Sequence, residues 1–483
     1  MSPRPHFLVI TFPFQGHIAP ALRLARRLLA AAPDALVTFS TTEHAHRRMF
    51  PSTKSTDEDN NDGDGRLEFV PFSDGTDAGY VHGGGGGDAG SFNTYMSSFH
   101  PGGARSLGAI LDALAARGRP VTRVAYTLLL PWAADVARAR GVPSALYWIQ
   151  PVAVFAIYHH YFRGGGCVAA IVDAHRGDPS FVVELPGLPP HAVRDLPSFI
   201  TQSTDPTDPL HSCFTTLRDL FDTLGREAPD KATVLVNSCQ DLELGALAAV
   251  EEAAYDVLPV GPVLPSSGNG NDAGIFKQDE AANYMDWLGS KPADSVVYVS
   301  FGSLAAMGKE QLDELIRGLE ETGRPYLCVV RKDIKAAVLA SDEVEIDAGV
   351  QKGVVVEWCD QVSVLSHAAV GCFVTHCGWN SVLESLACGV PMVGLGLLSD
   401  QRMNAQLVAR DWRVGVRAEV DGDGVLRAAE LRRCVEEVMG DGETAAEVRR
   451  MAREWKQVIG AAVGEGGSSD RNLMCFVNGT TSA

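Results

Sequence analysis

Residues 358–401 read WCDQVSVLSHAAVGCFVTHCGWNSVLESLACGVPMVGLGLLSDQ. The apolar run at 372–375 has the length of a buried strand, and a histidine, a cysteine and a glycine follow it as a turn. A helix is predicted to begin around Trp379–Ser381 and to end near Cys388, because glycine and proline follow. Met392–Leu395 reads as the next strand. This order of strand, turn, helix and strand is typical of a parallel α/β sheet.

The start of the predicted helix has the chemistry of an anion site. Backbone N–H groups and the helix dipole attract negative charge there, and His376, Asn380 and Ser381 add polar side chains. The pattern predicts a diphosphate site, although Asn380 and Ser381 alone are also compatible with simple helix capping. Cys372 and Cys377 flank His376, but we interpret them as small residues of a buried strand and predict no metal.

Three further polar residues follow in the same segment. Glu384 lies one helical turn beyond Ser381, so both share a face, where a carboxylate suits a ribose diol. The alternative for Glu384 is a solvated surface residue. Asp400 and Gln401 follow the next strand at its carboxyl end, and their carboxylate and amide suit sugar hydroxyls.

Strand and helix patterns alternate along the rest of the chain, beginning with a strand at Phe7–Thr11. The Pro-, Gly-, Ser- and Asn-rich stretch that starts at residue 259 reads as an exposed linker. We expect an α/β protein with two Rossmann-like, doubly wound parallel sheets facing a cleft. The expected parts are a domain at 1–258, a linker at 259–280, a domain at 281–460, and a tail at 461–483 that packs back on the first domain.

Composition limits the classes of partner. The 483 residues hold 41 Lys and Arg against 60 Asp and Glu, and a net charge of −19 disfavours nucleic acid and anionic membranes. No apolar run of about 18 residues predicts a membrane span. The ten cysteines include no CxxC pair, and no leader pattern opens the chain, so reduced thiols in the cytosol are expected.

The segment as a whole resembles the donor-binding box of plant family 1 UDP-dependent glycosyltransferases. That box opens with Trp, contains HCGWNSxxE and closes with Asp-Gln after 44 residues, as 358–401 does here. FPFQGH at 12–17, FGS at 301–303 and the chain length also fit. PWAADVA at 131–137 is most similar to the branch of anthocyanin 5-O-glucosyltransferases and enzymes that form glucose esters.

The resemblance implies the GT-B architecture and a role for each donor residue. Uracil would stack on Trp358, and the ribose hydroxyls would bind Glu384. Gln401 favours glucose, so the implied co-substrate is UDP-glucose, with no further cofactor. The full implied donor set is Ser303, Trp358, Cys359, Gln361, His376, Gly378, Trp379, Asn380, Ser381, Glu384, Asp400 and Gln401.

By the same resemblance, His17 is the general base that takes the proton of a small hydrophobic acceptor. Imidazole suits this task because its usual pKa is near neutral. The acceptor oxygen would then attack the anomeric carbon with inversion. Without the motif around it, a turn histidine such as His17 is more often a cap or a satisfied surface group.

The chain departs from the family pattern beside this histidine. Many relatives place an Asp where Thr127 stands here, and Asp135 reads as a surface helix residue. Loss of an orienting carboxylate matters less for an acceptor that is already ionised, such as a carboxylic acid, than for a phenol. We therefore give a carboxylate acceptor slightly more weight, with phenols still open.

The acceptor itself is not defined by the sequence. Candidate acceptor contacts are Phe14, Thr127, Trp148 and Phe155, and the aromatic ones fit a packed core equally well. A flavonoid, an anthocyanin, a phenolic or an acidic hormone all remain open, and a monomer is expected. Two other functions are possible for such a chain. The intact His17 argues against an inactive UDP-sugar binding protein, and the missing GxGxxG argues against a nicotinamide-dependent oxidoreductase.

Overall fold

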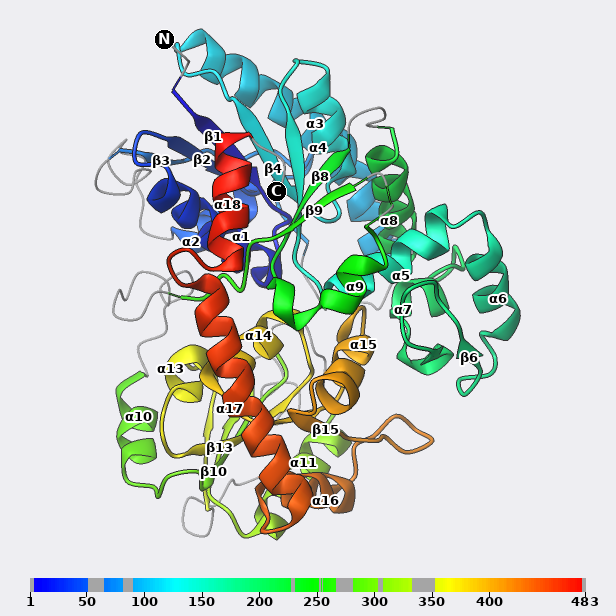
Figure 1. Ribbon diagram of the computed structural model, residues 1–483, viewed down its shortest axis with the longest axis vertical. Coiled ribbons are helices and arrows are strands. Elements are labelled where there is room, and N and C mark those ends of the chain that lie inside the picture. The colour runs from blue at the N-terminus through cyan, green and yellow to red at the C-terminus, as the bar shows by residue number, and fades with distance from the viewer. Residues whose placement is uncertain are drawn as a thin grey trace. The chain divides into compact units, whose positions relative to one another are not determined.

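Two separate parallel β-sheets organise the computed structural model of the chain, one in each of two units (Figure 1). Unit 1 comprises Met1–Phe276 and Ala462–Ala483, and unit 2 comprises Lys277–Ala461. The structure describes residues 4–50, 65–80, 90–226, 231–251, 253, 255–265, 281–302, 307–331 and 352–479.

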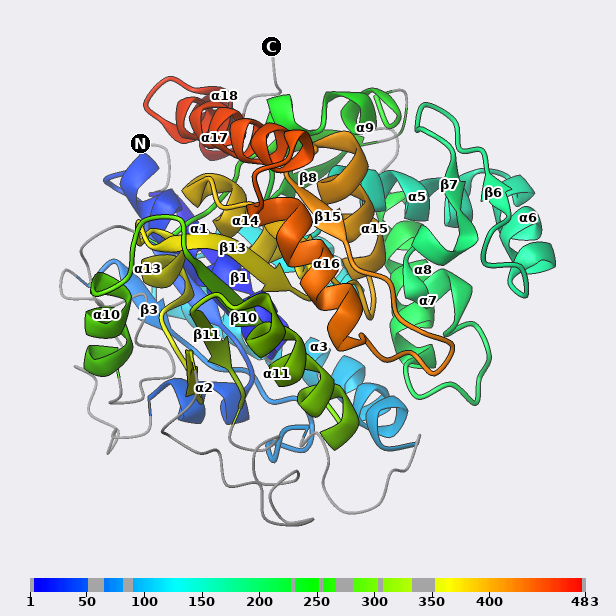
Figure 2. The same cartoon turned by 90° about the horizontal axis from the view of Figure 1, so that it is seen from below.

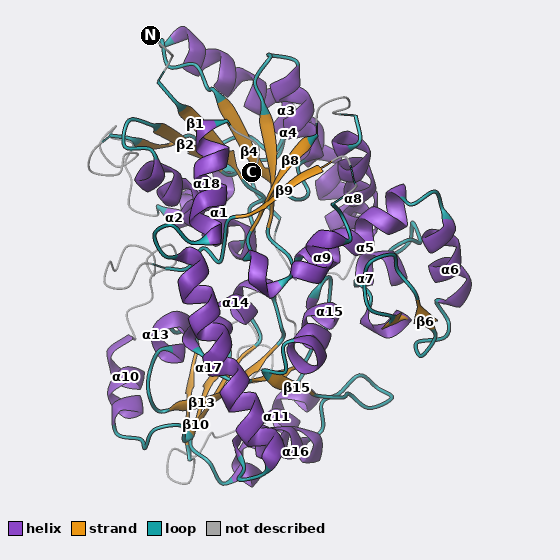
Figure 3. Ribbon diagram, viewed as in Figure 1, coloured by secondary structure: helices purple, strands orange, loops and turns teal. Residues whose placement is uncertain are grey.

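The sheet of unit 1 is parallel throughout and has the strand order β3-β2-β1-β4-β5-β8-β9. β1 and β2 are buried at every position, as expected for strands covered by helices on both faces. Figure 3 shows helices around each sheet. The strands are β1 (His6–Ile10), β2 (Leu36–Ser40), β3 (Leu67–Phe69), β4 (Arg123–Thr127), β5 (Ser144–Trp148), β8 (Ala232–Val236) and β9 (Tyr255–Pro259).

The first helix of unit 1 buries one apolar face. In α1 (Gln15–Ala31) this face includes Ile18, Leu22, Ala25 and Leu29. A two-stranded antiparallel ribbon, β6 (Val182–Val183) with β7 (His191–Ala192), stands apart from the main sheet. The other helices are α2 (Glu43–Met49), α3 (Gly90–Ala116), α4 (Pro131–Arg138), α5 (Val152–Arg163), α6 (Cys167–His175), α7 (Ser198–Thr201), α8 (His211–Leu224) and α9 (Leu244–Ala248), with 3-10 turns at Val193–Asp195 and Gln240–Leu242.

The last helix, α18 (Ser468–Asn478), packs on α1 and β9 of unit 1 (Figure 1). The Oγ of Ser469 donates to the carbonyl of Gly261 at 2.5 Å, and the Nδ2 of Asn472 donates to the carbonyl of Pro259 at 2.9 Å. The guanidinium of Arg123 donates to the carbonyl of Phe476 and lies over its ring. The tail expected at 461–483 thus contains the end of α17 (Glu443–Val463) and all of α18.

The sheet of unit 2 is also parallel, with the order β12-β11-β10-β13-β14-β15. Its strands are β10 (Val296–Ser300), β11 (Tyr326–Val329), β12 (Gly353–Val356), β13 (Val370–Thr375), β14 (Met392–Gly394) and β15 (Gly415–Arg417). Its helices are α10 (Ala281–Gly289), α11 (Lys309–Thr322), α13 (Gln361–Leu365), α14 (Trp379–Cys388), α15 (Gln401–Gln406), α16 (Ala428–Met439) and α17 (Glu443–Val463), with a π-helical turn at Leu407–Asp411.

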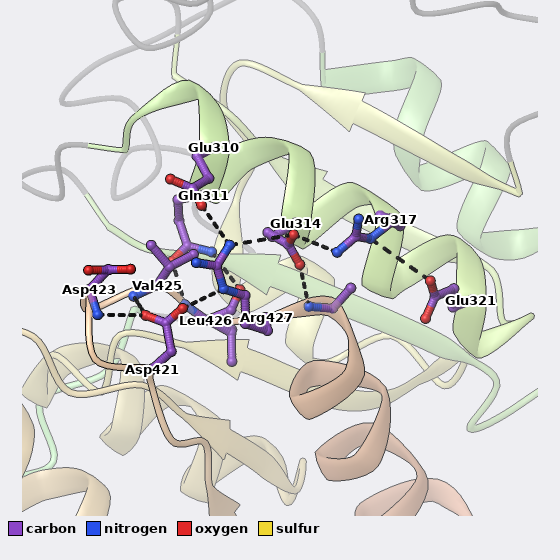
Figure 4. Close-up of polar contacts among 11 residues, drawn as sticks. Glu310, Gln311, Glu314, Arg317, Glu321, Asp421, Asp423, Val425, Leu426 and Arg427 are labelled. Atoms are coloured by element: carbon purple, nitrogen blue, oxygen red, sulfur yellow. Dashed lines mark hydrogen bonds and ion pairs between the residues drawn. The ribbon is translucent and has the colours of Figure 1, made fainter.

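Helices α11 and α16 lie side by side on one face of this sheet (Figure 2). A polar network ties the loop before α16 to α11, as Figure 4 shows. The side chain of Gln311 pairs with the backbone of Leu426, with N···O distances of 2.9 and 3.1 Å. Arg427 bonds to both Asp421 and Glu310. These contacts hold the start of α11 against the loop that leads into α16.

Candidate active site

The strand–turn–helix predicted from the sequence is present at the carboxyl end of β13. The strand is buried at every position, and Cys377 turns the chain with a φ of 57°. Gly378 is the N-cap of α14, so no side chain caps the helix, and its first turn carries no acidic residue. The helix ends at Cys388, followed by Gly389 at a φ of 75°. This helix start has the features of an anion site.

The ring of His376 packs between two glycines at this turn. A Cβ on Gly378 would come within 2.4 Å of the His376 Nε2, and one on Gly302 within 2.7 Å, so neither position accepts a side chain without a shift. Burial lowers the pKa of His376 to about 4, and its Nδ1 has no hydrogen-bond partner among the described residues. At neutral pH the imidazole is therefore uncharged and can offer an N–H rather than a charge.

A second group of side chains joins α13 to α14. The Nε2 of Gln361 donates to the Oγ of Ser381 at 3.0 Å and to the Oε2 of Glu384 at 2.9 Å. Glu384 is only 7% exposed, so the solvated alternative for it is wrong. Trp358 is half-buried just before α13, and Cys359 beside it is buried. An amide, a hydroxyl and a carboxylate thus converge next to a partly exposed aromatic ring.

Asp400 and Gln401 follow β14, the neighbour of β13 in the sheet. The Oδ2 of Asp400 accepts from the Nδ2 of Asn404 at 2.7 Å, and the same Nδ2 donates to the carbonyl of Cys377 at 2.8 Å. The Oε1 of Gln401 accepts from the backbone N–H groups of Leu397 and Leu398. Asn404 therefore links the Asp400 carboxylate to the turn before α14, and the N–H groups hold the orientation of Gln401.

The side chain of Trp379 is 4% exposed and packs on Trp412, with ring centroids 5.9 Å apart. Trp412 in turn accepts, through its carbonyl, a hydrogen bond from the Nε1 of Trp455 in α17. A sugar contact from Trp379 would have to come from its backbone, because its ring is packed in the interior. Ser303, the remaining residue of the implied donor set, lies outside the described residues.

The protonation of Asp400 gives a prediction for the pH dependence of donor binding. Burial raises the pKa of its carboxyl to about 6, so below that pH it loses the charge that would accept sugar hydroxyls. As the pH falls from 8 to 5 we expect the KM for UDP-glucose to rise severalfold and the Kd of uridine, which has no phosphate that titrates in this range, to stay within twofold. Asp400→Asn should abolish this difference, and equal slopes for both ligands in the unaltered protein would contradict the assignment.

In unit 1, His17 lies in the first turn of α1, next to the end of β1. Its ring is 5.4 Å from that of Phe12, and its Nδ1 has no hydrogen-bond partner among the described residues. Burial lowers the pKa of His17 to about 3, so the imidazole is neutral at pH 7. A neutral imidazole can accept a proton, but no carboxylate in the described part of the chain bonds to its Nδ1 to stabilise the charged form.

Thr127 does not take the place of such a carboxylate. It is fully buried, and its Oγ1 accepts from the N–H of Phe12 at 3.2 Å and donates to the Oγ1 of Thr11 at 3.3 Å. The hydroxyl thus joins the ends of β1 and β4. Asp135 forms an ion pair with Arg138, with both side chains largely exposed, as expected for a surface helix. Among the described residues, neither Thr127 nor Asp135 forms a hydrogen bond with the Nδ1 of His17.

The aromatic acceptor candidates separate into two groups. Trp148 and Phe155 have no exposed surface and pack together with Phe221 in the core of unit 1, which agrees with the core alternative that the sequence leaves open. The sequence alone does not distinguish a ring in the core from a ring in a pocket wall. Phe14 is half-buried and packs on Phe12 and on the half-buried Tyr80. Tyr80 is a candidate that the sequence did not indicate.

Sequence reasoning also missed Tyr298 and Asn404, which bond to residues of the candidate site. Tyr298 lies inside the apolar strand β10, and a buried tyrosine hydroxyl needs a hydrogen-bond partner. This feature of the sequence could have indicated its role. Asn404 stands four residues after Asp400, on the same helix face. Among the described residues, no cluster of three His, Cys, Asp or Glu could hold a metal, and no helix has the length and apolarity to cross a membrane.

The chain is similar to known proteins along nearly its whole length. A family model described as "UDP-glucoronosyl and UDP-glucosyl transferase" matches residues 259–454. Crocetin glucosyltransferase, chloroplastic, of Gardenia jasminoides is 42% identical over 98% of this chain and 96% of its own length. The chain belongs to this family. It is a UDP-dependent glycosyltransferase of the plant family 1 type.

Other relatives agree with this assignment. Anthocyanidin 3-O-glucoside 5-O-glucosyltransferase 1 of Perilla frutescens is 40% identical over 98% of both chains. The crystal structure of Os79 from O. sativa in complex with UDP superposes on this glycosyltransferase with a TM-score of 0.79 at 31% identity, covering 98% of this chain and 99% of that one. The predicted GT-B fold, with two Rossmann-like units, is therefore confirmed.

Proposed function

We propose that this glycosyltransferase moves glucose from UDP-glucose to a hydroxyl or carboxyl group of a small hydrophobic plant metabolite, with inversion at the anomeric carbon. The observation that carries the proposal is the uncapped start of α14, with Ser381 and Glu384 on the same helix and both bonded to Gln361. One helix thereby offers an anion site for a pyrophosphate and, one turn later, acceptors for a ribose.

Each part of the donor has a proposed partner. Uracil stacks on Trp358 beside the backbone of Cys359, and the ribose bonds to Gln361 and Glu384. The pyrophosphate binds at Gly378 with His376, Asn380, Ser381 and Ser303. Glucose binds at Asp400 and Gln401 and at the backbone of Trp379. The backbone N–H groups at the start of α14 and the dipole of this helix stabilise the negative charge of the departing UDP, so the proposal requires no metal.

His17 is the proposed general base. It takes the proton of the acceptor as the acceptor oxygen forms a bond to the anomeric carbon, and UDP leaves with the electron pair of the broken bond. With its pKa lowered and its Nδ1 unpaired among the described residues, His17 is a weak base. A carboxylic acid, already ionised at neutral pH, needs little help from such a base, and this supports a carboxylate acceptor over a phenol.

The half-buried rings of Phe14 and Tyr80 support an aromatic or otherwise apolar acceptor. They form the partly exposed end of an aromatic cluster that starts at Phe12, whose ring lies against His17. The cytosol remains the proposed compartment, although the name of the Gardenia relative says chloroplastic. A monomer also remains a proposal.

An acceptor screen with labelled UDP-glucose tests the function. We expect transfer to at least one apolar carboxylic acid or phenol, and β-linked glucose in the product by the proton coupling of its anomeric centre. Absence of transfer to every acceptor, with hydrolysis no faster than without protein, would contradict the proposal. An α-linked product would contradict the inverting mechanism.

The same screen on Thr127→Asp examines the preference for carboxylates. A carboxylate at this position would offer His17 the partner it lacks, so the rate with phenols should rise more than the rate with carboxylic acids. Equal gains for both acceptor classes would remove the argument from the unpaired imidazole.

A further inference from the structure

Tyr298 lies in the centre of β10, and its side chain contacts Cys359 and Gln361, two of the residues proposed to hold the nucleoside. It is 1% exposed, and its ring stacks on that of Phe373 at a centroid distance of 4.8 Å. Its hydroxyl lies 3.2 Å from the Sγ of Cys359 and 3.2 Å from the Oε1 of Gln361. One buried hydroxyl is thus within hydrogen-bond distance of two residues that are proposed to bind the nucleoside.

The direction of these hydrogen bonds follows from chemistry. An ionised carboxylate only accepts, so the group of Gln361 that lies 2.9 Å from Glu384 must be its NH2. The Oε1 of Gln361 therefore faces Tyr298, and the tyrosine hydroxyl must donate to it. Burial raises the pKa of Tyr298 well above its usual range, so the hydroxyl keeps its proton. Burial also raises the pKa of Cys359 to about 12, so its thiol can donate to Tyr298.

We propose that Tyr298 is a positioning residue for the donor nucleotide: its hydroxyl fixes the amide of Gln361 so that the NH2 group holds Ser381 and Glu384 in place. This inference rests on the proposed binding of uridine at these residues. Tyr298 itself touches no substrate in this account. It acts through Gln361 of α13 on Ser381 and Glu384 of α14.

Loss of the hydroxyl should weaken binding rather than chemistry. Without a donor, the Oε1 of Gln361 stays buried and unpaired once a nucleotide covers the site. The alternative is rotation of the amide, which would place its oxygen against the carboxylate of Glu384, and two acceptors repel. In either case Ser381 and Glu384 lose their fixed partner, whereas the groups proposed for the sugar and for His17 are unchanged.

Tyr298→Phe tests the inference, with Tyr326→Phe as the matched control. Tyr326 is equally buried on the adjacent strand β11, but its hydroxyl donates to Glu320, which is not in the candidate site. We expect Tyr298→Phe to raise the Kd for UDP about tenfold, or ~1.4 kcal/mol, and to raise the KM for UDP-glucose similarly. The kcat at saturating donor should stay within twofold. Tyr326→Phe should leave the Kd unchanged, whatever it does to the melting temperature.

A double-mutant cycle separates positioning from general destabilisation. In a Gln361→Ala background, Tyr298→Phe should change the Kd for UDP by less than twofold, because the amide on which it acts is gone. Equal weakening by the two Tyr→Phe variants, an unchanged Kd in Tyr298→Phe, or a full tenfold effect without Gln361 would each overturn the inference. Failure of the unaltered protein to bind UDP would instead refute the proposed function.

Discussion

Replacement of His17 by alanine should lower kcat by about a thousandfold with a phenol as acceptor at saturating UDP-glucose, because a positioned general base contributes roughly 10²–10⁴ in rate. The imidazole is neutral at pH 7, and in the described residues no other titratable side chain is bonded to it. Steady-state kinetics with a phenol and with a carboxylic acid would measure the loss. The loss should be larger with the phenol, since only that acceptor must give up a proton.

The Kd for UDP should stay within twofold in this variant, because the proposed nucleotide residues are elsewhere in the chain. Asp135→Asn is the matched control: Asp135 is an ionisable residue of the same unit that pairs with Arg138 at the surface, so its kinetics should be unchanged. Retention of most of the phenol activity in His17→Ala would refute the base assignment.

Glu384→Ala is expected to raise the Kd for UDP about a hundredfold. The carboxylate is 7% exposed and accepts a hydrogen bond from Gln361, and the proposal adds two ribose hydroxyls to its partners. Hydrogen bonds to a charged group are worth about 1.5–3 kcal/mol each, and the variant also leaves the amide of Gln361 with only one of its two acceptors, the Oγ of Ser381. Titration calorimetry of the variant and the unaltered protein would measure the change.

Glu384→Gln should give an intermediate loss, because an amide keeps one acceptor and the shape of the side chain but not the charge. Glu447→Ala, which removes a carboxylate paired with Arg413 at the surface of the same unit, should leave the Kd unchanged. An effect of Glu384→Ala below threefold would show that the ribose does not bind at this carboxylate.

The parts of the fold that local chemistry determines could be predicted from the sequence. The start of α14 at Trp379, its end at Cys388 and the buried strand before it follow from glycine positions and apolar runs, and the structure has them as predicted. The burial of Glu384 could not be predicted with certainty, because it depends on α13, a helix of five residues that brings Gln361 against it.

The features of the site that the sequence does not predict depend on how the strands are aligned in the sheet and on how side chains pack between elements. Tyr298 and Phe373 are register partners across β10 and β13, and the sequence of either strand alone does not show this pairing. Likewise, Trp148 ends β5 and its ring turns into the core against Phe155 and Phe221. An aromatic residue at a strand end is compatible with a pocket or with a core, and packing that only the folded chain reveals decides between them.

The most direct test of the account is a calorimetric comparison of UDP with uridine on the unaltered protein. If the pyrophosphate binds at the uncapped start of α14, both ligands should bind saturably and UDP should bind at least tenfold more tightly, with an advantage that shrinks as salt is added. Equal affinities for UDP and uridine, or no saturable heat with either up to millimolar concentration, would contradict the central claim.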